Sequence, residues 1–549
     1  MNGLTRWLER FFLCLAFALV IGALAVRAPL PAIPIPDGDT WGYLRPALCW
    51  LSGLGFRQTY GRAWLYPALL TGILKITGGF AGIFYVQQLL GLASILIFCL
   101  TWTSWLKQLP VKGLVWRSVR FSIGAVVVSL YALSPQQAVL QSSIRPEGIL
   151  AFFEVAYLYC LVSFFRVRWR LHRTAPTILL GGAVLGLSYV ILLLKPSWGF
   201  SLGFTLVVLI AGAFGKTDQW LRFGPLLSGG CACLFLITLP KILDFQKDGQ
   251  EGSFLPMTLV SIHAPQILQT ASARPLSTID QGKLDQAFYT KLAEAYRKAR
   301  ENPMPFPVLG FDADFIFYGS GFFSSIKQQE GWTDSQLTAA CYSSYFQAWR
   351  YEPALMLYKI ANQTDLFLFP RFEDFYSTGK SFHLDQELAA SRSYLLNEKF
   401  SPEVGRIYQS YLRMLESPPV TRSHSLRLPF LTWVAQGIAA VSLLLQVAFF
   451  LAMIAIWWLP HRPSFLLAGL TASAVLASTY GNVFTLVSVH TLEITRYRLG
   501  YAPMLLLGLG MIISFLLPLV FNTVASWRNG LGRSSRTAAQ ENPIGRPHI

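Results

Sequence analysis

Long apolar segments constrain this chain more than any other feature of its sequence. Each approaches or exceeds the roughly 20 residues that an α-helix needs to cross the hydrocarbon core of a bilayer. The predicted spans are 11–30, 81–106, 121–140, 148–165, 177–194, 197–214, 223–240, 429–459, 464–487 and 500–522. The composition agrees, since 53% of the 549 residues are hydrophobic and only 13% are charged. The sequence therefore predicts an all-α polytopic membrane protein with about ten transmembrane helices.

The distribution of basic residues predicts the orientation in the membrane. A formal net charge of +17 can indicate nucleic-acid binding, but here the Lys and Arg residues lie mostly at the ends of the apolar segments. An even number of spans puts both termini on one side, and that side carries far more bases than the short loops opposite. The positive-inside rule then makes both termini cytoplasmic. We expect a multi-pass protein of the plasma (inner) membrane that contacts anionic membrane lipids and binds no nucleic acid.

The spans divide the chain into four parts. Residues 1–242 form a transmembrane module with a first outer loop at 31–80, and residues 429–525 hold the C-terminal transmembrane helices. Residues 243–428 carry 20 of the 28 acidic residues and are too long for a loop, so they should form a mostly helical extracytoplasmic domain. Helices are expected there at 278–301, 333–362, 385–398 and 402–416, the second of them interrupted near Pro353. The remaining residues, 526–549, have the composition of a disordered basic tail.

The N-terminal segment leaves an alternative open. Ala23-Leu24-Ala25 resembles a signal-peptidase cleavage site, so the first span could be a cleaved signal peptide. Cleavage would leave an odd number of spans and would spoil the charge pattern.

Two carboxylates one residue apart, Asp37 and Asp39, stand in the first outer loop. Pro36 and Gly38 flank Asp37 and favour a turn, after which residues 41–54 have the pattern of a short amphipathic helix. A turn leaves both acids free to face a ligand. At the membrane surface they would lie where a lipid head group and a water-soluble substrate can meet.

Charged residues of both signs recur in the other short outer loops. Outside residues 243–428 only eight acids remain, and four of these belong to three outer loops, together with several bases. The acids are Asp37, Asp39, Glu147 and Glu493, and the bases are Arg62, Arg145, Lys195, Arg496 and Arg498. Because they share one side of the membrane, we expect a site whose bases hold a phosphate and whose carboxylate takes a proton.

Several of these residues have a second, structural interpretation. Lys195 stands near Trp198, as a lysine that extends to the membrane interface beside an aromatic ring would. Glu154 shares a helix face with Glu147, and it is either functional or paired inside the bundle. The pair in Asp312-Ala313-Asp314 repeats the spacing of the first loop, but there we expect a solvated turn.

The outer-loop motifs resemble those of the family-C glycosyltransferases. The resemblance rests on the run Pro36-Asp37-Gly38-Asp39 with Tyr43, the Gly53-Leu54-Gly55-Phe56 turn, Tyr66-Pro67, Gln87-Gln88-Leu89-Leu90-Gly91, Ser134-Pro135, Pro146-Glu147, Lys195-Pro196, and Glu493 with Arg496-Tyr497. The family comprises polytopic enzymes that use polyprenyl-phosphate sugars, including protein O-mannosyltransferases and the aminoarabinose transferases of lipid A. The motifs cover roughly the first 200 residues and the last outer loop, and they do not reach residues 243–428.

The resemblance implies roles for individual residues. Asp37 or Asp39 would take a proton from an acceptor hydroxyl or orient it, with Asp37 the closer match and Asp39 a departure from the single acid of many relatives. Arg496 and Lys195, assisted by Arg145 and Arg62, would bind the donor phosphate. The further site candidates are Tyr43, Glu147, Glu493, Tyr497 and His490.

The resemblance also implies the reaction class. A sugar would pass with inversion from the lipid donor to an envelope glycan, lipid or protein outside the cytoplasm. A divalent cation on Asp37 and Asp39 is compatible with this chemistry but not required, because basic side chains can neutralise the leaving group. A transporter or flippase for a lipid-linked or anionic solute is the main alternative, since an intramembrane acid such as Glu154 suits transport. A non-catalytic scaffold whose outer domain binds a partner is a second.

Overall fold

The computed structural model describes most of the chain. The described residues are 2–58, 62–110, 114–214, 219–242, 245–247, 254–273, 282–301, 309–368, 398–416, 428–456, 462–489 and 494–540. The expected helix at 385–398 lies almost wholly outside these ranges, and His490 and Glu493 lie outside them as well.

The prediction of an all-α polytopic protein is confirmed. Within the described residues, ten helical segments are long and apolar enough to cross a membrane. The helices that carry them are α1 (Asn2–Arg27), α4 (Ala81–Leu106), α5 (Leu114–Ala132), α7 (Glu147–Arg166), α8 (Thr174–Leu194), α9 (Phe200–Ala213), α10 (Gln219–Ile242), α20 (Pro429–Ala455), α21 (Arg462–Val489) and α22 (Ile494–Gln540). The π-helical η1 (Val167–Leu171) extends α7, and the 3-10 turn η2 (Pro196–Trp198) precedes α9.

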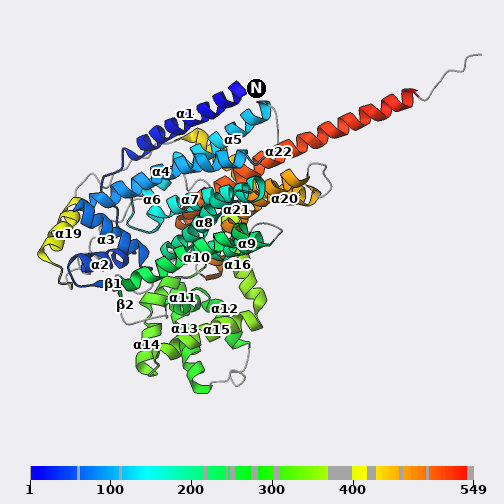
Figure 1. Ribbon diagram of the computed structural model, residues 1–549. Helices are drawn as coiled ribbons and strands as arrows, with labels where there is room; N and C mark the ends of the chain where they lie inside the picture. Colours follow the sequence, from blue (N-terminus) through cyan, green and yellow to red (C-terminus); the bar gives the residue numbers. More distant parts are fainter. Residues whose placement is uncertain are drawn as a thin grey trace, which may run out of the picture.

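The spanning helices differ in how much of their surface the protein covers. In α22 the spanning window is 89% buried, whereas in α20 it is 11% buried. The apolar side chains of α20 therefore face outward, which is where lipid chains would contact them in a bilayer. Figure 1 shows the N-terminus and the far end of α22 at one end of the bundle, opposite α2 and α3.

The third predicted span, 121–140, is wrong in its boundaries. Helix α5 ends at Ala132, and a separate short helix, α6 (Pro135–Leu140), follows it. Ser134 caps α6 by accepting a hydrogen bond from the backbone N–H of Gln137, and Pro135 occupies the first helical position. A proline there starts a helix because it needs no hydrogen-bond partner for a missing N–H. The break turns the chain back towards the first outer loop.

The predicted disordered tail is also wrong as far as the described residues extend. Helix α22 continues to Gln540 and projects away from the bundle (Figure 1). The sequence contains no proline between Pro518 and Pro543, so no residue in this stretch removes a backbone donor from the helix.

The first outer loop contains α2 (Thr40–Leu51), β1 (Phe56–Gln58) and α3 (Leu65–Thr77). The expected Gly turn is present: Gly53 and Gly55 have φ values of 76° and 78°, a backbone region that favours glycine. Strand β1 pairs in parallel with β2 (Phe245–Lys247), and Ile35 pairs with Ser143 of the next outer segment. These pairings hold the first loop against two other outer segments.

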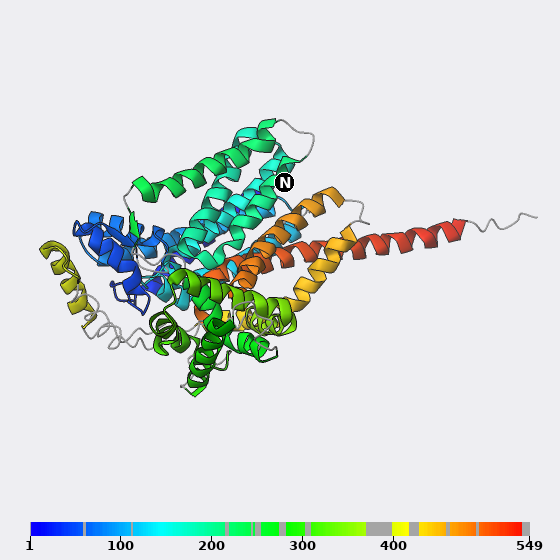
Figure 2. The ribbon, with the colours of Figure 1, turned by 90° about the horizontal axis from the view of Figure 1, so that it is seen from below.

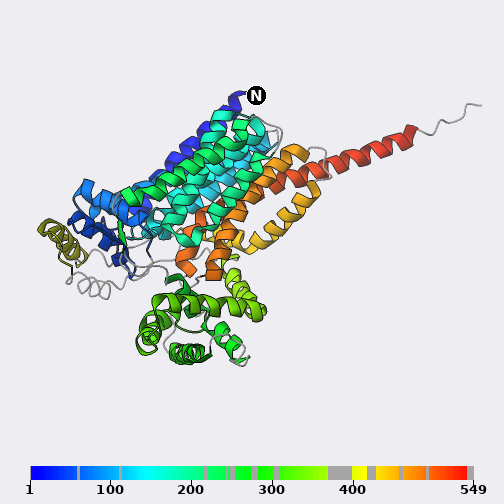
Figure 3. The same ribbon diagram turned by 60° about the horizontal axis from the view of Figure 1, so that its bottom comes forward.

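The helices between residues 254 and 356 form a lobe with its own hydrophobic core. Figure 3 shows this lobe beside the spanning helices. It contains α11 (Phe254–Ile262), α12 (Ala264–Ser272), α13 (Gly282–Glu301), the π-helical η4 (Phe315–Gly319), α14 (Phe322–Gln329), α15 (Asp334–Tyr351) and the start of α16 (Pro353–Leu368). The expected helix at 333–362 is therefore two helices, divided before Pro353 as the proline predicts.

The last outer helix, α19 (Pro402–Leu415), does not join this lobe core. It lies beside α2 and α3 (Figures 1 and 2), where the Tyr411 ring stacks on Phe80 with a centroid separation of 4.0 Å. The Tyr411 hydroxyl donates to the carbonyl oxygen of Pro34 at 2.7 Å. Residues of the predicted 243–428 domain thus contribute to two separate hydrophobic cores.

Candidate functional site

The turn between Pro36 and Thr40 is held by its own side chains. One oxygen of Asp37, Oδ1, accepts from the backbone N–H of Asp39 at 2.8 Å, and the backbone N–H of Asp37 donates to Thr40 Oγ1 at 2.8 Å. Asx-type contacts of this kind are why Asp and Thr favour turns. The Asp37 carboxylate is therefore partly used by the turn, whereas the Asp39 side chain extends away from it.

Asp37 also pairs with a base from the next outer segment. Its second oxygen, Oδ2, forms a salt bridge with Arg145. The segment that carries Arg145 is fixed to the first loop by backbone hydrogen bonds, from Ile35 to the Ser142 carbonyl at 2.8 Å and from Ile144 to the Ile35 carbonyl at 3.0 Å. The pair thus joins two loops that the backbone already brings together.

Asp39 lies between two guanidinium groups. Arg62 Nη2 is 2.5 Å from Asp39 Oδ1, and Arg496 Nη2 is 3.0 Å from Asp39 Oδ2. Burial alone would raise the pKa of Asp39, but Arg496 and then Arg62 outweigh it, so the pKa lies below its ordinary value. Asp39 is therefore ionised at neutral pH and is a weak proton acceptor while both guanidinium groups remain in place.

Glu147 is the buried acid of the cluster. It is 2% exposed at the start of α7, and its Oε1 accepts from Lys195 Nζ at 2.6 Å and from Arg496 Nε at 2.7 Å. Its other oxygen, Oε2, has no hydrogen-bond partner among the described residues. A buried carboxylate oxygen without a partner is costly, so Oε2 is a ready acceptor for a ligand hydroxyl.

Lys195 is 8% exposed and lies at the turn between α8 and α9. Its ammonium lies 4.4 Å from the centroid of the Tyr497 ring. Burial lowers the pKa of Lys195 to about 8, although Glu147 counteracts this shift. Near neutral pH this lysine is cationic, but it loses its charge at a lower pH than an exposed lysine would.

Two tyrosines from the predicted set line the charged cluster. The Arg62 guanidinium lies 5.2 Å from the centroid of Tyr43, and Arg496 lies 5.7 Å from that of Tyr497. Both rings are buried, so they exclude water around the charges they contact.

The sequence-predicted residues thus fall into one cluster wherever the structure describes them. Its charged members are Asp37, Asp39, Arg62, Arg145, Glu147, Lys195 and Arg496, and they come from four outer segments. Four bases and three acids leave one net positive charge. A partly buried cluster with excess positive charge is suited to an anionic group.

Glu154 lies apart from these ion pairs. It is fully buried in α7, and its Oε1 accepts from Trp198 Nε1 at 2.6 Å. This contact agrees with its interpretation as an acid paired inside the bundle.

Two functional contacts were not anticipated from the sequence. Thr40 holds the Asp37 turn, and its position three residues after that acid was the available signal. Tyr318, from η4 in the lobe, is among the groups that raise the pKa of Arg62. Nothing in the sequence connects these two residues, because their proximity depends on how the lobe packs beside the first loop.

The acid pair in the first loop does not fit a metal ion in this conformation. Asp37 pairs with Arg145, and Asp39 pairs with Arg62 and Arg496, so a divalent cation would have to displace guanidinium groups. No cluster of three or more His, Cys, Asp or Glu residues that could hold a metal occurs within the described residues.

Comparisons with known proteins give one similar solved structure. It is the archaeal oligosaccharyltransferase AglB from Archaeoglobus fulgidus in complex with an inhibitory peptide and a dolichol-phosphate. The TM-score is 0.36 and the sequence identity 13%, over 98% of this chain and 53% of the AglB chain. This chain therefore spans about half the length of AglB, and a similarity of this degree supports no argument about the function. No family model matches the chain, and no curated protein matches it.

Proposed function

We propose that this protein is a membrane glycosyltransferase that moves a sugar from a polyprenyl-phosphate donor to an acceptor outside the cytoplasm. The position of Arg496 carries the proposal: this base, at the start of the last span, contacts both Asp39 and Glu147. Cationic groups for a phosphate and a carboxylate for a hydroxyl are thereby combined at one end of the bundle that the described spanning helices form. There, a lipid-borne substrate and a water-soluble one can meet.

The bases would hold the donor phosphate and stabilise it as it leaves. Arg496 presents a planar guanidinium, which can form paired hydrogen bonds with phosphate oxygens, and Lys195 adds a second positive charge. Arg62 and Arg145 complete the positive set. As the bond between the anomeric carbon and the phosphate oxygen breaks, the electron pair remains on the phosphate, where these cations stabilise it.

Asp39 is our candidate for the proton acceptor. Sequence resemblance favours Asp37, but in the structure Asp37 holds the turn and pairs with Arg145, whereas Asp39 contacts the proposed phosphate-binding Arg496. Asp39 would take the proton of an acceptor hydroxyl while that oxygen attacks the anomeric carbon. Attack from the face opposite the phosphate inverts the anomeric configuration.

Donor binding would also make Asp39 a better base. A phosphate that binds Arg496 competes with Asp39 for the same guanidinium. Once that contact weakens, the main lowering influence on the pKa of Asp39 is reduced. The acid would then accept a proton efficiently only when a donor is in place, which disfavours deprotonation of the acceptor before the sugar arrives.

The proposal includes the setting of the reaction. The ends of the chain face the cytoplasm of a plasma (inner) membrane, and the 243–428 region lies outside, where an envelope glycan, lipid or protein is the acceptor. The charge asymmetry of the sequence supports this orientation. Figure 1 agrees with it, because α2, α3 and the lobe lie away from the N-terminus and the far end of α22.

Mass spectrometry of cells with and without the gene tests this function. We expect one sugar to be missing from an envelope glycan, lipid or protein in the deletion strain, while the matching polyprenyl-phosphate sugar accumulates on the outer face. Unchanged glycans and donor levels would contradict the proposal.

A transporter or flippase is the alternative, and the buried Glu154 favours it. Its Oε2 has no hydrogen-bond partner among the described residues, as an intramembrane group that meets a passing ion or solute can show. In that case the deletion strain would trap the lipid-linked sugar on the inner face of the membrane. The same mass spectrometry, combined with an impermeant label for the sugar, separates the two functions.

A further inference from the structure

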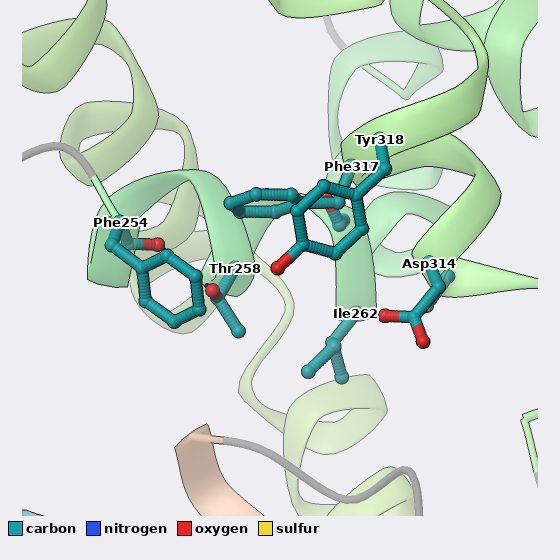
Figure 4. A pocket seen from close by; sticks show the side chains of 8 residues that line it. Phe254, Thr258, Ile262, Asp314, Phe317 and Tyr318 are labelled. Atoms are coloured by element: carbon teal, nitrogen blue, oxygen red, sulfur yellow. Dashed lines mark hydrogen bonds between the residues drawn. The ribbon is translucent and has the colours of Figure 1, made fainter. Parts of the chain in front are cut away.

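An open cleft lies in the lobe between α11 and η4. Its volume is about 30 Å³, and its lining includes Phe254, Thr258, Ile262, Asp314, Phe317 and Tyr318. Figure 4 shows Thr258 between Phe254 and Tyr318, with the carboxylate of Asp314 on the other side of the cleft, next to Ile262. The enclosed space suits a group as small as a hydroxyl or hydroxymethyl, since a single water needs roughly 10–15 Å³ measured in this way. A larger ligand would rest on the aromatic rim.

A π-helical turn shapes the aromatic side of the cleft. Phe317 and Tyr318 lie in η4, with ring centroids 4.4 Å apart, and Phe317 packs on Phe254 at 5.2 Å. Isolated π-helical turns are rare and occur often at functional sites. Tyr318 is nevertheless 66% exposed, so the turn presents a large ring to solvent instead of burying it. An exposed aromatic ring on a rigid element is a typical contact surface.

The cleft adjoins the charged cluster through Arg62. This base contacts Asp39 at 2.5 Å, and Tyr318, when ionised, is among the groups that raise the pKa of Arg62. The backbone supports the same proximity, because β1, shortly before Arg62, pairs with β2, which shortly precedes α11. A molecule resting on Tyr318 could therefore extend to the carboxylate that we propose as proton acceptor.

The polar groups of the cleft match a polyhydroxylated ring. Asp314 accepts hydrogen bonds, and the Thr258 hydroxyl donates to the Phe254 carbonyl at 2.8 Å, which leaves its oxygen as an acceptor for a ligand. Ring hydroxyls donate to such acceptors, and the apolar face of a sugar can pack on tyrosine. The described lining consists of helical turns, so it provides no strand edge for an extended peptide.

We infer that this cleft binds a sugar ring of the acceptor, with Tyr318 as the stacking surface and Asp314 as the hydroxyl partner. The inference rests on the proposed function and names its acceptor class as a carbohydrate, in a soluble glycan or a glycolipid. The 312–314 segment, expected from the sequence to be a solvated turn, then has two roles. Asp312 accepts from the backbone N–H of Phe315 at 2.9 Å and holds the turn, while Asp314 faces the ligand.

Direct sugar binding tests the inference without any transfer reaction. Purified protein in lipid nanodiscs is mixed with a panel of methyl glycosides and examined by saturation-transfer difference NMR. We expect saturation of the ring protons of at least one glycoside. Tyr318→Ala should weaken its binding about 3- to 10-fold, as loss of an aromatic contact predicts. Tyr318→Phe should keep most of it, and Asp314→Asn should weaken it.

Tyr358→Ala is the matched control, because this tyrosine is similarly exposed, at 68%, on a different helix. It should leave glycoside binding unchanged. Absence of saturation across the panel, or equal effects of the two alanine variants, would overturn the inference. Binding of tyrosine-containing peptides that depends on Tyr318, without glycoside binding, would also overturn it.

The same samples distinguish this inference from the proposed function. Arg496→Ala should retain glycoside binding, because the cleft does not include that residue. If glycosides bind through Tyr318 but the wild-type protein transfers no sugar, the proposed function fails while the sugar-binding assignment of the cleft stands. If the wild type transfers sugar and Tyr318→Ala leaves the acceptor KM unchanged, the cleft is not the acceptor site. Repeating the titration with a glycolipid in the nanodisc shows which source of the sugar binds more tightly.

Discussion

The Arg496 guanidinium lies 3.0 Å from the Asp39 carboxylate, although one residue begins the last span and the other belongs to the first outer loop. Through Glu147 the same guanidinium is also connected to Lys195. Opposite ends of the chain are thus required to build one charged cluster. A ligand that competes for Arg496 would act on both acids at once.

Loss of the bases that we propose to bind the donor phosphate should impair donor use. For Arg496→Ala and for Lys195→Ala we expect a loss of about 1.5–3 kcal/mol of donor interaction, or roughly one to two decades in kcat/KM. Arg498→Ala is the matched control, since Arg498 is a neighbouring arginine whose side chain donates to the Leu366 carbonyl at 2.9 Å. Steady-state kinetics with the lipid donor, together with size-exclusion profiles, provide the measurement. Wild-type donor kinetics in both cluster variants would show that these bases do not bind the donor and instead anchor the helices at the membrane interface.

The pH dependence of donor use should report the Lys195 ammonium. This group is cationic below its pKa of about 8, so kcat/KM for the donor should fall as the pH rises through that value. Lys195→Arg keeps its charge and should move the fall to higher pH.

The free energy of unfolding should rise with pH over part of the pH range in which kcat/KM for the donor falls. The unfolded lysine has a pKa near 10.4, so between about pH 8 and pH 10 the unfolded state binds more protons. The contribution of this group to the free energy of unfolding therefore rises with pH. If the pH profiles of kcat/KM and of stability are the same in Lys195→Arg as in the wild type, a group other than Lys195 titrates.

Helix α19 should stabilise the first outer loop through Tyr411. Tyr411→Phe removes the hydrogen bond to the Pro34 carbonyl and should cost about 0.5–1.5 kcal/mol. Tyr411→Ala also removes the stack on Phe80 and should cost about 3–5 kcal/mol, the range for deletion of a buried aromatic ring. Thermal unfolding in detergent measures both. Equal melting temperatures in the two variants and the wild type would show that α19 does not support the loop.

The spans were predictable because a long apolar segment is unfavourable in water, and in lipid an α-helix satisfies all of its backbone hydrogen bonds. The boundary of the third span was not, although Ser134-Pro135 carried the signal of a new helix. The break was concealed because Ala138, Val139 and Leu140, which follow it, are apolar and continue the hydropathy of α5.

The membership of the charged cluster was predictable from sidedness alone, but its pairing was not. No rule of spacing connects Asp39 with Arg496, or Asp37 with Arg145, since each pair depends on how separate segments pack. For the same reason the sequence did not predict that Lys359 is buried. Its ammonium donates at 2.5 Å to the carbonyl of Val487, near the end of α21. From the sequence this lysine is one of many in a polar region.

Cysteine labelling tests the orientation. In a variant without its native cysteines, an impermeant thiol reagent on intact cells should label Ser324→Cys in the lobe, where the serine is exposed. Lys107→Cys, exposed after α4 on the opposite side, should react only after the cells are opened. Labelling of position 107 alone on intact cells would reverse the topology and place the charged cluster in the cytoplasm.

The central claim is that Asp39 is the proton acceptor of the transfer site, and substitution of the two first-loop acids, singly and together, tests it in the transfer assay. Asp39→Asn keeps the size of the side chain but cannot accept a proton, so we expect transfer to fall at least about 100-fold, the low end of general-base contributions. Asp37→Asn should have a smaller effect, because the amide oxygen can still accept from the backbone N–H of Asp39.

The decisive measurement is therefore the rate of sugar transfer by purified Asp39→Asn, Asp37→Asn and the double variant, with donor binding measured in parallel. The account predicts a loss of at least about 100-fold for Asp39→Asn, with donor binding largely kept. Near-normal transfer by Asp39→Asn and by the double variant would contradict the account, because it would remove both acids from the transfer mechanism.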